Sequence, residues 1–525
     1  MDTGDDNMDA LEELLAYSAD DLSVDGLDDP SEPQMLEPCL TKVTSGNEHM
    51  SSDTTYAEPC AHHGLTRSVT AAASFVLFSC YSFVEADGMW RLSPQDASFL
   101  ENRGCFHLPA KPALDEFVTQ YFRHVHPVLP LLNELEFWTM YLVPRPPSDA
   151  QARLSLFLFQ AILFVSCPYV PASTLRSLGF PTVRRARGEF YSRAKALFDI
   201  DTYRNDVANA QGALMLTYHA LSNDDKTNTY WLSTAVHFAR NAGADQYAAV
   251  DDTLQRKRSS LKRLWWCCIL RDRIMALGLR RSLHIRSTEF DFSQTGLTES
   301  DFQDEIRGSM VYNPATKQVL AQLAVSFCEL AVALNDSLTF LYPVGGTNAR
   351  SGDPRQTERY LEACSAGLHH WYEKTVAKFH IPTQMVGIHD ALILFTDMLY
   401  IYYHTAKVSI SNQSVLFSIT HPSVYEGRRD RRLEAQEELD RSLRCITEHL
   451  VELENLDLVK YLPNTFVAFY ALPFVWYSLD ATLTSTGSRT EDVLRDLKIY
   501  AEVMKAFENL YETTDSVLQC VEKTG

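Results

Sequence analysis

Helical periodicity is the feature that most restricts the fold of this chain. From about residue 110 onward, apolar side chains recur every three or four positions, and the alternation that marks a half-buried strand is nearly absent. The first stripe of this kind comprises Leu114, Phe117, Tyr121 and Val125. A later stripe, whose opposite helix face is charged, comprises Leu439, Leu443, Ile446, Leu450 and Leu453. We therefore expect an all-α fold, with one large helical domain over residues 111–525.

Several apolar stretches are candidates for buried core helices. Residues 155–165 have helical spacing, and residues 71–110 suggest a helix followed by a linker. Residues 71–84 are too short to cross a membrane, which takes about 20 apolar residues, and residues 464–479 are interrupted by Pro473. We expect core helices at these places and no membrane partner.

The negative charge of the chain is concentrated at its beginning. Residues 1–70 hold 16 Asp and Glu against Lys42 and Arg67, so they contribute −14 to the net charge of −21. A segment of this composition buries too little apolar surface to offset the entropy lost on ordering. We predict a disordered acidic tail before a nearly neutral body.

One segment of the tail mixes leucines with acidic residues. Leu11, Leu14 and Leu15 interleave with Asp and Glu, and Met8, Leu11 and Leu15 fall on one helical face. Two interpretations stay open. The segment is either an activation segment that folds onto the groove of a coactivator, or a solvated tail without a partner.

Motifs for catalysis, cofactors and metals are missing. The sequence has no HExxH, GxSxG, GxGxxG or GxxxxGK[ST] motif. Its eleven cysteines are scattered without a CxxC pair, which indicates reduced, intracellular thiols. Cys39, Cys60, His62 and His63 lack the spacing of a zinc site. We expect no catalytic, cofactor-binding or metal-binding residue.

A helical enzyme acting on diphosphates is the one enzyme class that the size and helicity suggest. Terpene cyclases of this kind hold magnesium with clustered carboxylates. The closest match places Asn228 where a second acid would stand after Asp224. A second motif through Asn335 and Thr339 has Pro343 at its Glu position. Both motifs are incomplete, so a polar turn is the better interpretation of the first.

A basic run, RKRSSLKR, covers residues 256–263. It has the composition of a nuclear import signal. It also leads directly into a tryptophan-rich helix, and the solvated start of that helix is the interpretation that we favour. Both interpretations stay open.

Five sequence blocks, in order, resemble a known family. The segment LDEFVTQYFRHVHPVLPLL is similar to the opening of the fungal-specific transcription factor domain, also called the middle homology region. SLFLFQAILFVSCPYVPASTLRSLGF, YWLSTAVHFARNAGA and LPNTFVAFYALPFVWYSLD resemble later parts of the cutinase transcription factor beta group. The block KRLWWCCILRDRIMALGLRRSLHI matches the family's arginine, tryptophan and Asp-Arg pattern at Arg263, Trp265, Trp266, Asp272 and Arg273. The resemblance covers roughly residues 105–485.

The tryptophan block has two structural expectations of its own. Asp272 and Arg273 suggest a partly buried ion pair that fixes packing. Trp265 and Trp266 point to different sides of a helix, so at least one should be in the core.

The resemblance implies a nuclear regulator of transcription and no enzyme. Members of the family usually begin with a basic six-cysteine zinc cluster, whereas Cys39, Cys60 and Cys80 have no such spacing. We therefore expect DNA to be bound weakly or through a partner transcription factor, with a coactivator as a further partner; a homodimer is compatible with this. Two alternatives remain, a co-regulator or small-molecule sensor that does not target DNA, and the terpene-cyclase-like enzyme.

Overall fold

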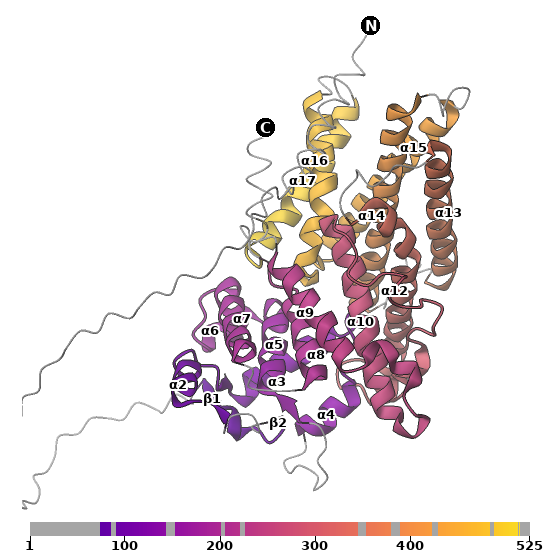
Figure 1. Ribbon diagram of the computed structural model, residues 1–525. Coiled ribbons are helices and arrows are strands. Elements are labelled where there is room, and N and C mark those ends of the chain that lie inside the picture. Colours follow the sequence, from indigo (N-terminus) through magenta and orange to yellow (C-terminus); the bar gives the residue numbers. More distant parts are fainter. Residues whose placement is uncertain are drawn as a thin grey trace, which may run out of the picture. The chain divides into compact units, whose positions relative to one another are not determined.

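The computed structural model describes residues 74–85, 91–142, 153–200, 205–220, 226–344, 353–379, 389–422, 429–483, 488–512 and 514. The chain divides into two compact units, Met1–Ala72 and Ala73–Gly525, and all described residues lie in the second. The predicted disordered tail and its leucine segment therefore lie outside the described residues. The expected all-α class is confirmed, because helices dominate the described part and its strands are few and short (Figure 1).

The helices of the first half are α2 Pro94–Asn102, α3 Lys111–Gln120, α4 Glu134–Leu142, α5 Leu156–Ser166, α6 Ala172–Ser177, α7 Val183–Asp199, α8 Asp206–Leu216 and α9 Thr227–Asn241. Those of the second half are α10 Gln255–Leu279, α11 Gln303–Gly308, α12 Pro314–Leu341, α13 Pro354–Lys378, α14 Asp390–Thr420, α15 Arg429–Asn455, α16 Val467–Leu483 and α17 Ser488–Glu508. The strands are β1 Phe75–Leu77, β2 Val84–Glu85, β3 His107–Pro109 and β4 Leu154–Ser155.

The apolar segment at residues 74–85 is not the helix that we expected. It forms β1 and β2 instead, with β1 antiparallel to β3 and β2 parallel to β4. The segment is rich in Phe and Val, which favour strands, and it pairs with residues that follow much later in the chain. A short apolar run does not distinguish a strand from a buried helix, so the expectation of a helix was wrong here.

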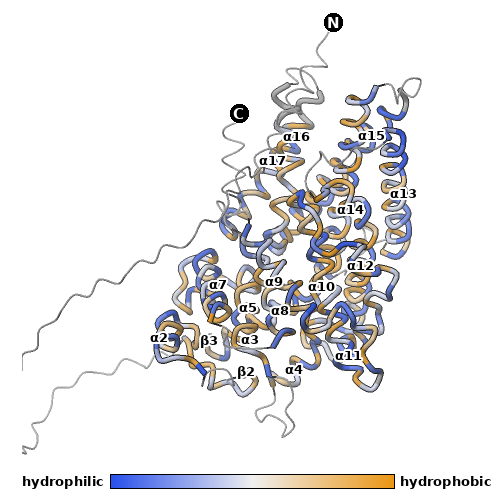
Figure 2. Tube along the Cα trace, viewed as in Figure 1, coloured by the Kyte–Doolittle hydropathy of each residue, from blue (hydrophilic) through white to orange (hydrophobic). Residues whose placement is uncertain are grey.

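Helix α10 lies at the centre of the hydrophobic core. Its side chains from Leu264 to Leu277 are buried all around the helix, whereas its first turns are exposed. It packs against α8, α9, α12, α14 and α16, which cover its different sides (Figures 1 and 2). A helix that is buried on all sides lies in the interior of a large domain, and the charged side chains in this part of α10 must find partners there. Every side chain of α5 is likewise buried, as its sequence predicted.

Two further helices show how the core overrides local signals. Helix α12 is long and apolar enough to cross a membrane, but 61% of its most apolar window is buried against other helices. Helix α16 continues through Pro473, where the sequence suggested an interruption.

The predicted amphipathic face of α15 is confirmed, because its five stripe residues, from Leu439 to Leu453, are all buried.

Candidate functional site

The tryptophan block identified in the sequence lies entirely inside the core. Arg263, Trp265, Trp266, Asp272 and Arg273 follow one another on α10, and none of their side chains is more than 2% exposed. The structure therefore buries both tryptophans, although the sequence required only one of them to be buried. Such burial leaves no accessible surface for a ligand at this block and indicates that its polar groups act within the protein.

Asp272 and Arg273 form the expected ion pair, and it is fully buried. Arg273 Nη1 lies 2.6 Å from Asp272 Oδ2. The same carboxylate accepts backbone N–H groups of His284 and Ile285, each at 3.0 Å. Arg273 also donates to Asn335 Oδ1 at 2.8 Å. The pair thus fastens the segment after α10 to α10 itself and to α12.

The environment of Asp272 favours its charged form. Burial raises the pKa of this carboxyl group, but hydrogen bonds from His284 and Ile285 and the charge of Arg273 outweigh burial and leave the pKa below its ordinary value.

Asn335 belongs to the second of the incomplete diphosphate motifs considered above, and its hydrogen bonds show a structural role instead. Asn335 Nδ2 donates to Ser287 Oγ at 2.7 Å, and Asn335 Oδ1 accepts from Arg273. Both ends of the amide are therefore used in hydrogen bonds within the protein.

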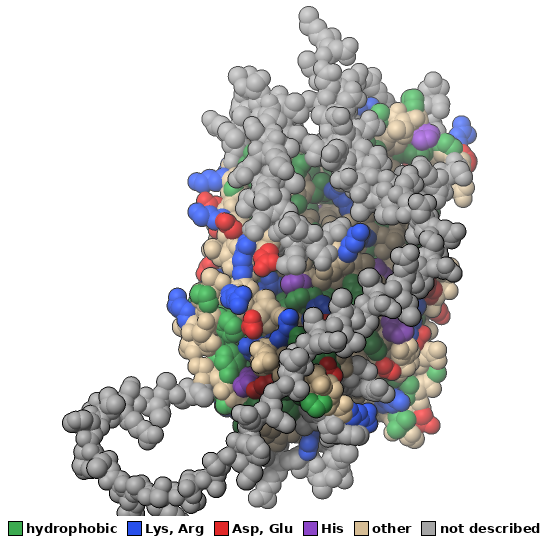
Figure 3. Space-filling model, turned by 60° about the vertical axis from the view of Figure 1, so that its left-hand side comes forward, with side chains coloured by type: hydrophobic (Ala, Val, Ile, Leu, Met, Phe, Trp, Pro, Cys, Tyr) green, Lys and Arg blue, Asp and Glu red, His purple; other side chains and the backbone are tan. Residues whose placement is uncertain are grey.

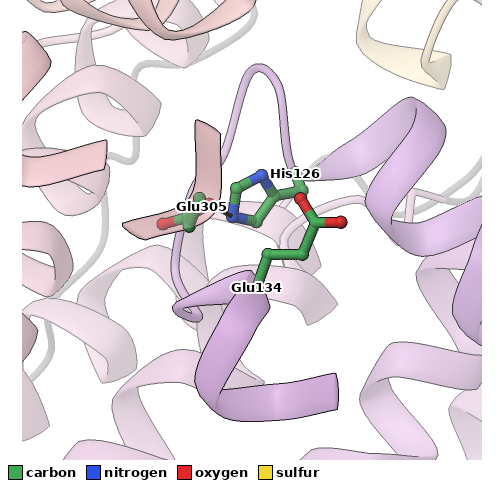
Figure 4. Close-up of side chains that lie close together, drawn as sticks. All are labelled: His126, Glu134 and Glu305. Carbon is green, nitrogen blue, oxygen red and sulfur yellow. Dashed lines mark ion pairs between the residues drawn. The ribbon is translucent and has the colours of Figure 1, made fainter. Parts of the chain in front are cut away.

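Arg263 connects the block to a second buried group of charges, which we call the Glu305 cluster. Its members come from different helices and from the turn after α3: His126, Glu134, Arg263, Glu305 and Lys317. Arg263 Nη2 lies 2.5 Å from Glu305 Oε1, and Lys317 Nζ lies 2.5 Å from Glu134 Oε2 and 3.3 Å from Glu305 Oε2. Figure 4 shows the His126 ring between the two carboxylates.

His126 is neutral and donates from Nε2. Burial, together with the charge of Lys317, holds the pKa of the ring well below its usual value. Nε2 lies 2.9 Å from the carbonyl oxygen of Leu132, which can only accept, so Nε2 carries the proton. Nδ1 is then the acceptor that faces Lys317 Nζ at 3.5 Å. Two carboxylates, one ammonium and one guanidinium leave the cluster without net charge.

The Glu305 cluster has metal-ligating side chains but is not a metal centre. His126, Glu134 and Glu305 bring their ligand atoms within 4.8 Å of one another. However, Lys317 Nζ contacts both carboxylates, where an ion would have to bind. A divalent ion would also add two positive charges to a balanced, buried group. The cluster is therefore a structural connection between α4, α10, α11 and α12.

The basic run before the tryptophans is split by the fold. Arg256 and Lys257 are exposed on the first turn of α10, whereas Arg263 is buried in the Glu305 cluster. Arg256 forms an exposed ion pair with Glu136. The run is thus in part a solvated helix start, and an import receptor would have only its first residues to bind.

His124, two residues before His126 of the Glu305 cluster, gives a testable dependence of stability on pH. Its ring is stacked between Tyr169 and Tyr461, with centroid distances of 4.9 and 4.3 Å. Burial, with a smaller contribution from Arg123, lowers the pKa of the ring to about 3. Below pH ~6.5 the unfolded chain binds a proton that the folded chain does not, so the folded state loses stability as the pH falls.

We expect His124→Phe to weaken this pH dependence while it keeps the aromatic stack. Between pH 6 and 4, the free energy of unfolding of the variant should fall less steeply than that of the wild type, by up to ~1.4 kcal/mol per pH unit. Urea denaturation at several pH values, followed by circular dichroism, measures this slope. The control is His369→Phe, because His369 is exposed. Equal slopes for wild type and His124→Phe would contradict the prediction.

Sequence reasoning found only part of these contacts. It identified the Asp272–Arg273 pair, whose members are neighbours in the chain. It did not identify His126, Glu134, Glu305 or Lys317, since 183 positions separate Glu134 from Lys317. Asp224 and the cysteine-histidine group at residues 39–63 lie outside the described residues.

Comparison with known proteins agrees with the resemblance. Residues 118–352 match the family described as the fungal specific transcription factor domain. Cutinase transcription factor 1 beta of Fusarium vanettenii is 29% identical over 48% of this chain and 30% of its own length. A transcription factor of Fusarium pseudograminearum is 23% identical over 82% of this chain and 50% of its own length. The acetamidase regulatory protein of Aspergillus fumigatus is 33% identical over 37% of this chain and 24% of its own length.

These alignments also set the limits of the likeness. The chain spans half or less of the length of the curated relatives named above. No solved structure matches it. The family match nevertheless includes α10 with its tryptophan block, the whole Glu305 cluster and the Asp272–Arg273 pair. Residues 118–352 of this chain therefore form a fungal specific transcription factor domain.

Proposed function

We propose that the chain regulates transcription of the genes of a metabolic or biosynthetic pathway in a fungal nucleus. The observation that supports this is the family match over residues 118–352. The names of the relatives support the pathway-specific part, since they include a cutinase transcription factor, an acetamidase regulatory protein and a fusaric acid cluster transcription factor. The Glu305 cluster and the Asp272–Arg273 pair fit a regulatory body, because their charges are paired with one another inside the protein.

We propose that this chain reaches DNA by binding a partner protein, which itself binds the DNA. Phosphate binding needs a surface of Lys and Arg, and this chain has a net charge of −21. Among the described residues on the face drawn in Figure 3, basic and acidic side chains are interspersed and form no continuous basic patch. A partner transcription factor would supply the base readout, and this chain would supply the regulatory body.

Chromatin profiling of the tagged chain, beside transcript profiling of a deletion strain, tests this function. We expect the tagged chain at the promoters of a small set of genes whose transcripts change in the deletion strain. Loss of the promoter signal after removal of a partner transcription factor would identify the route to DNA. Absence of the chain from chromatin, with unchanged transcripts in the deletion strain, would refute the proposed function.

The acidic segment gives a separate prediction about the sign of regulation. When the full chain is fused to an unrelated DNA-binding domain, we expect it to activate a reporter gene. Replacing Leu11, Leu14 and Leu15 together by alanine should abolish most of this activity, because apolar burial supplies the docking energy on a coactivator. Neutralising one or two acidic residues should only weaken it, since charge mainly steers the encounter.

The matched control removes three other leucines of the same tail, Leu36, Leu40 and Leu65. This variant should remain active, because these leucines lie outside the proposed segment. A silent wild-type fusion would favour a repressor or sensor over an activator. Full activity after loss of Leu11, Leu14 and Leu15 would refute docking through this segment.

A further inference from the structure

A second group of metal-ligating side chains lies between α14 and α15, two helices that pack side by side (Figure 1). His449 and Glu452 stand three residues apart on α15, and neighbours at that spacing share one helix face. Asp397 faces them from α14. Their ligand atoms lie within 4.8 Å of one another, and His449 Nδ1 is 3.0 Å from Asp397 Oδ1. We call these three residues the Asp397 cluster.

We propose that the Asp397 cluster binds one divalent transition-metal ion, of which Zn²⁺ is the best example. Asp397, His449 and Glu452 are the protein ligands, and solvent completes the coordination. The proposal goes beyond the regulatory function above and does not depend on it. Sequence reasoning predicted no metal site, because 52 positions separate Asp397 from His449 and neither belongs to a ligand motif.

The two buried clusters differ in the one respect that decides metal binding. In the Glu305 cluster, Lys317 and Arg263 neutralise the carboxylates. Within the part of the chain that the structure describes, neither Asp397 nor Glu452 has a Lys or Arg partner. Asp397 Oδ2 is buried without a hydrogen-bond partner, and the Asp397 side chain is only 7% exposed. A buried carboxylate oxygen without a partner is costly, and a metal ion would satisfy it.

The charges around the cluster favour an added cation. On α14, the ammonium of Lys407 is bound to Glu438 and is not available to Asp397 or Glu452. Among the described residues, the Asp397 cluster thus lacks the positive charge that two close carboxylates require.

The donor atoms select the class of metal. One imidazole and two carboxylates suit Zn²⁺ or a similar first-row ion, whereas Mg²⁺ and Ca²⁺ prefer oxygen ligands alone. Atoms 3.0 Å apart, such as His449 Nδ1 and Asp397 Oδ1, can both reach one ion at about 2.0–2.2 Å. Glu452 is only partly buried, which leaves a path for the ion and room for water.

The neighbouring side chains support a coordinating role. The Tyr400 ring lies 5.6 Å and the His404 ring 6.0 Å from that of His449, measured between centroids. The Tyr400 hydroxyl and both His404 ring nitrogens are buried and have no hydrogen-bond partner. Unsatisfied buried donors and acceptors of this number are unusual in one place. They indicate that apolar packing alone does not account for this part of the contact between α14 and α15.

Metal titration of the full chain tests the proposal. The purified protein is stripped with a chelator and titrated with Zn²⁺ by calorimetry and with Co²⁺ by visible absorption. We expect one tight site per chain, with a Co²⁺ spectrum that lacks a thiolate charge-transfer band. His449→Gln, Asp397→Asn and Glu452→Gln should each weaken binding roughly tenfold or more. Glu452→Gln changes the most accessible ligand, so it tests the site even where the buried variants do not fold.

The chain offers a matched control on its surface. His369 and Glu373 form an exposed pair on α13, with 3.4 Å between His369 Nε2 and Glu373 Oε1. His369→Gln should leave the affinity unchanged. Zinc held instead by Cys60 and His62 would survive the α14 and α15 variants and disappear in Cys60→Ser. Either that result, or no stoichiometric binding by the stripped wild type, would overturn the proposal.

Discussion

Replacing Glu305 by alanine is expected to lower the free energy of unfolding by about 3–5 kcal/mol, because it leaves two buried cations with a single carboxylate. The Glu305 side chain is fully buried. Arg263 lies 2.5 Å from one of its oxygens, and Lys317 and His126 lie 3.3 and 3.2 Å from the other. Water cannot replace these contacts without opening the junction of α4, α10, α11 and α12. Chemical denaturation at pH 7, followed by circular dichroism, measures the loss.

An exposed pair of the same chemistry provides the control. Glu289 lies 2.5 Å from Arg240, as Glu305 does from Arg263, but both side chains of that pair are more than a third exposed. Solvent screens such a pair, so Glu289→Ala should cost less than ~1 kcal/mol. The difference between the two alanine variants therefore isolates the effect of burial. Similar losses for both would show that the Glu305 cluster is no stronger than a surface ion pair.

A double substitution separates lost charge balance from lost packing. Glu305→Leu combined with Arg263→Met removes one negative and one positive charge and leaves Lys317 paired with Glu134. Replacing a buried pair by apolar groups of similar size is often close to neutral, whereas removing one partner is not. We therefore expect the double variant to be more stable than Glu305→Ala. A double variant as unstable as the single one would place the cost in packing.

The sequence predicted the fold where a pattern is local and repeated. The stripe from Leu439 to Leu453 predicted the buried face of α15, because helical spacing and burial coincide there. Residues 74–85 were predicted wrongly, because their structure depends on pairing with β3 and β4 far along the chain. Pro473 does not end α16, since packing against the core stabilises the helix beyond its local propensity.

The polar clusters show a similar limit of what can be predicted from sequence. Asp272 and Arg273 are adjacent, and the sequence indicated their pairing. The Glu305 cluster and the Asp397 cluster each draw on helices that are distant in the chain, and no spacing rule connects such residues. The basic run was also ambiguous from sequence, because the burial of Arg263 follows from the position of Glu305 and not from the neighbours of the run.

Substitution of the two tryptophans of α10 is the second change for which we expect a large effect. Trp265 is fully buried and Trp266 is 2% exposed, so alanine at either position should cost about 3–5 kcal/mol in cavity formation and lost burial. Both rings also contact Phe290 edge to face, at centroid distances of 5.5 and 6.4 Å. Each alanine variant therefore also loosens the segment after α10, which Asp272 fastens from the other side.

Phenylalanine at the same positions distinguishes the two rings. Trp266 Nε1 donates to the Tyr247 hydroxyl at 3.2 Å, whereas Trp265 Nε1 is buried without a partner. Trp266→Phe thus loses a hydrogen bond, and Trp265→Phe removes an unsatisfied donor, so the first should cost about 1 kcal/mol more than the second. Trp476→Ala, at a partly exposed position, is the control and should cost less than either core alanine variant. Because each change alters the tryptophan fluorescence itself, unfolding should be followed by circular dichroism. Neutral alanine variants would mean that the block does not form the centre of the core.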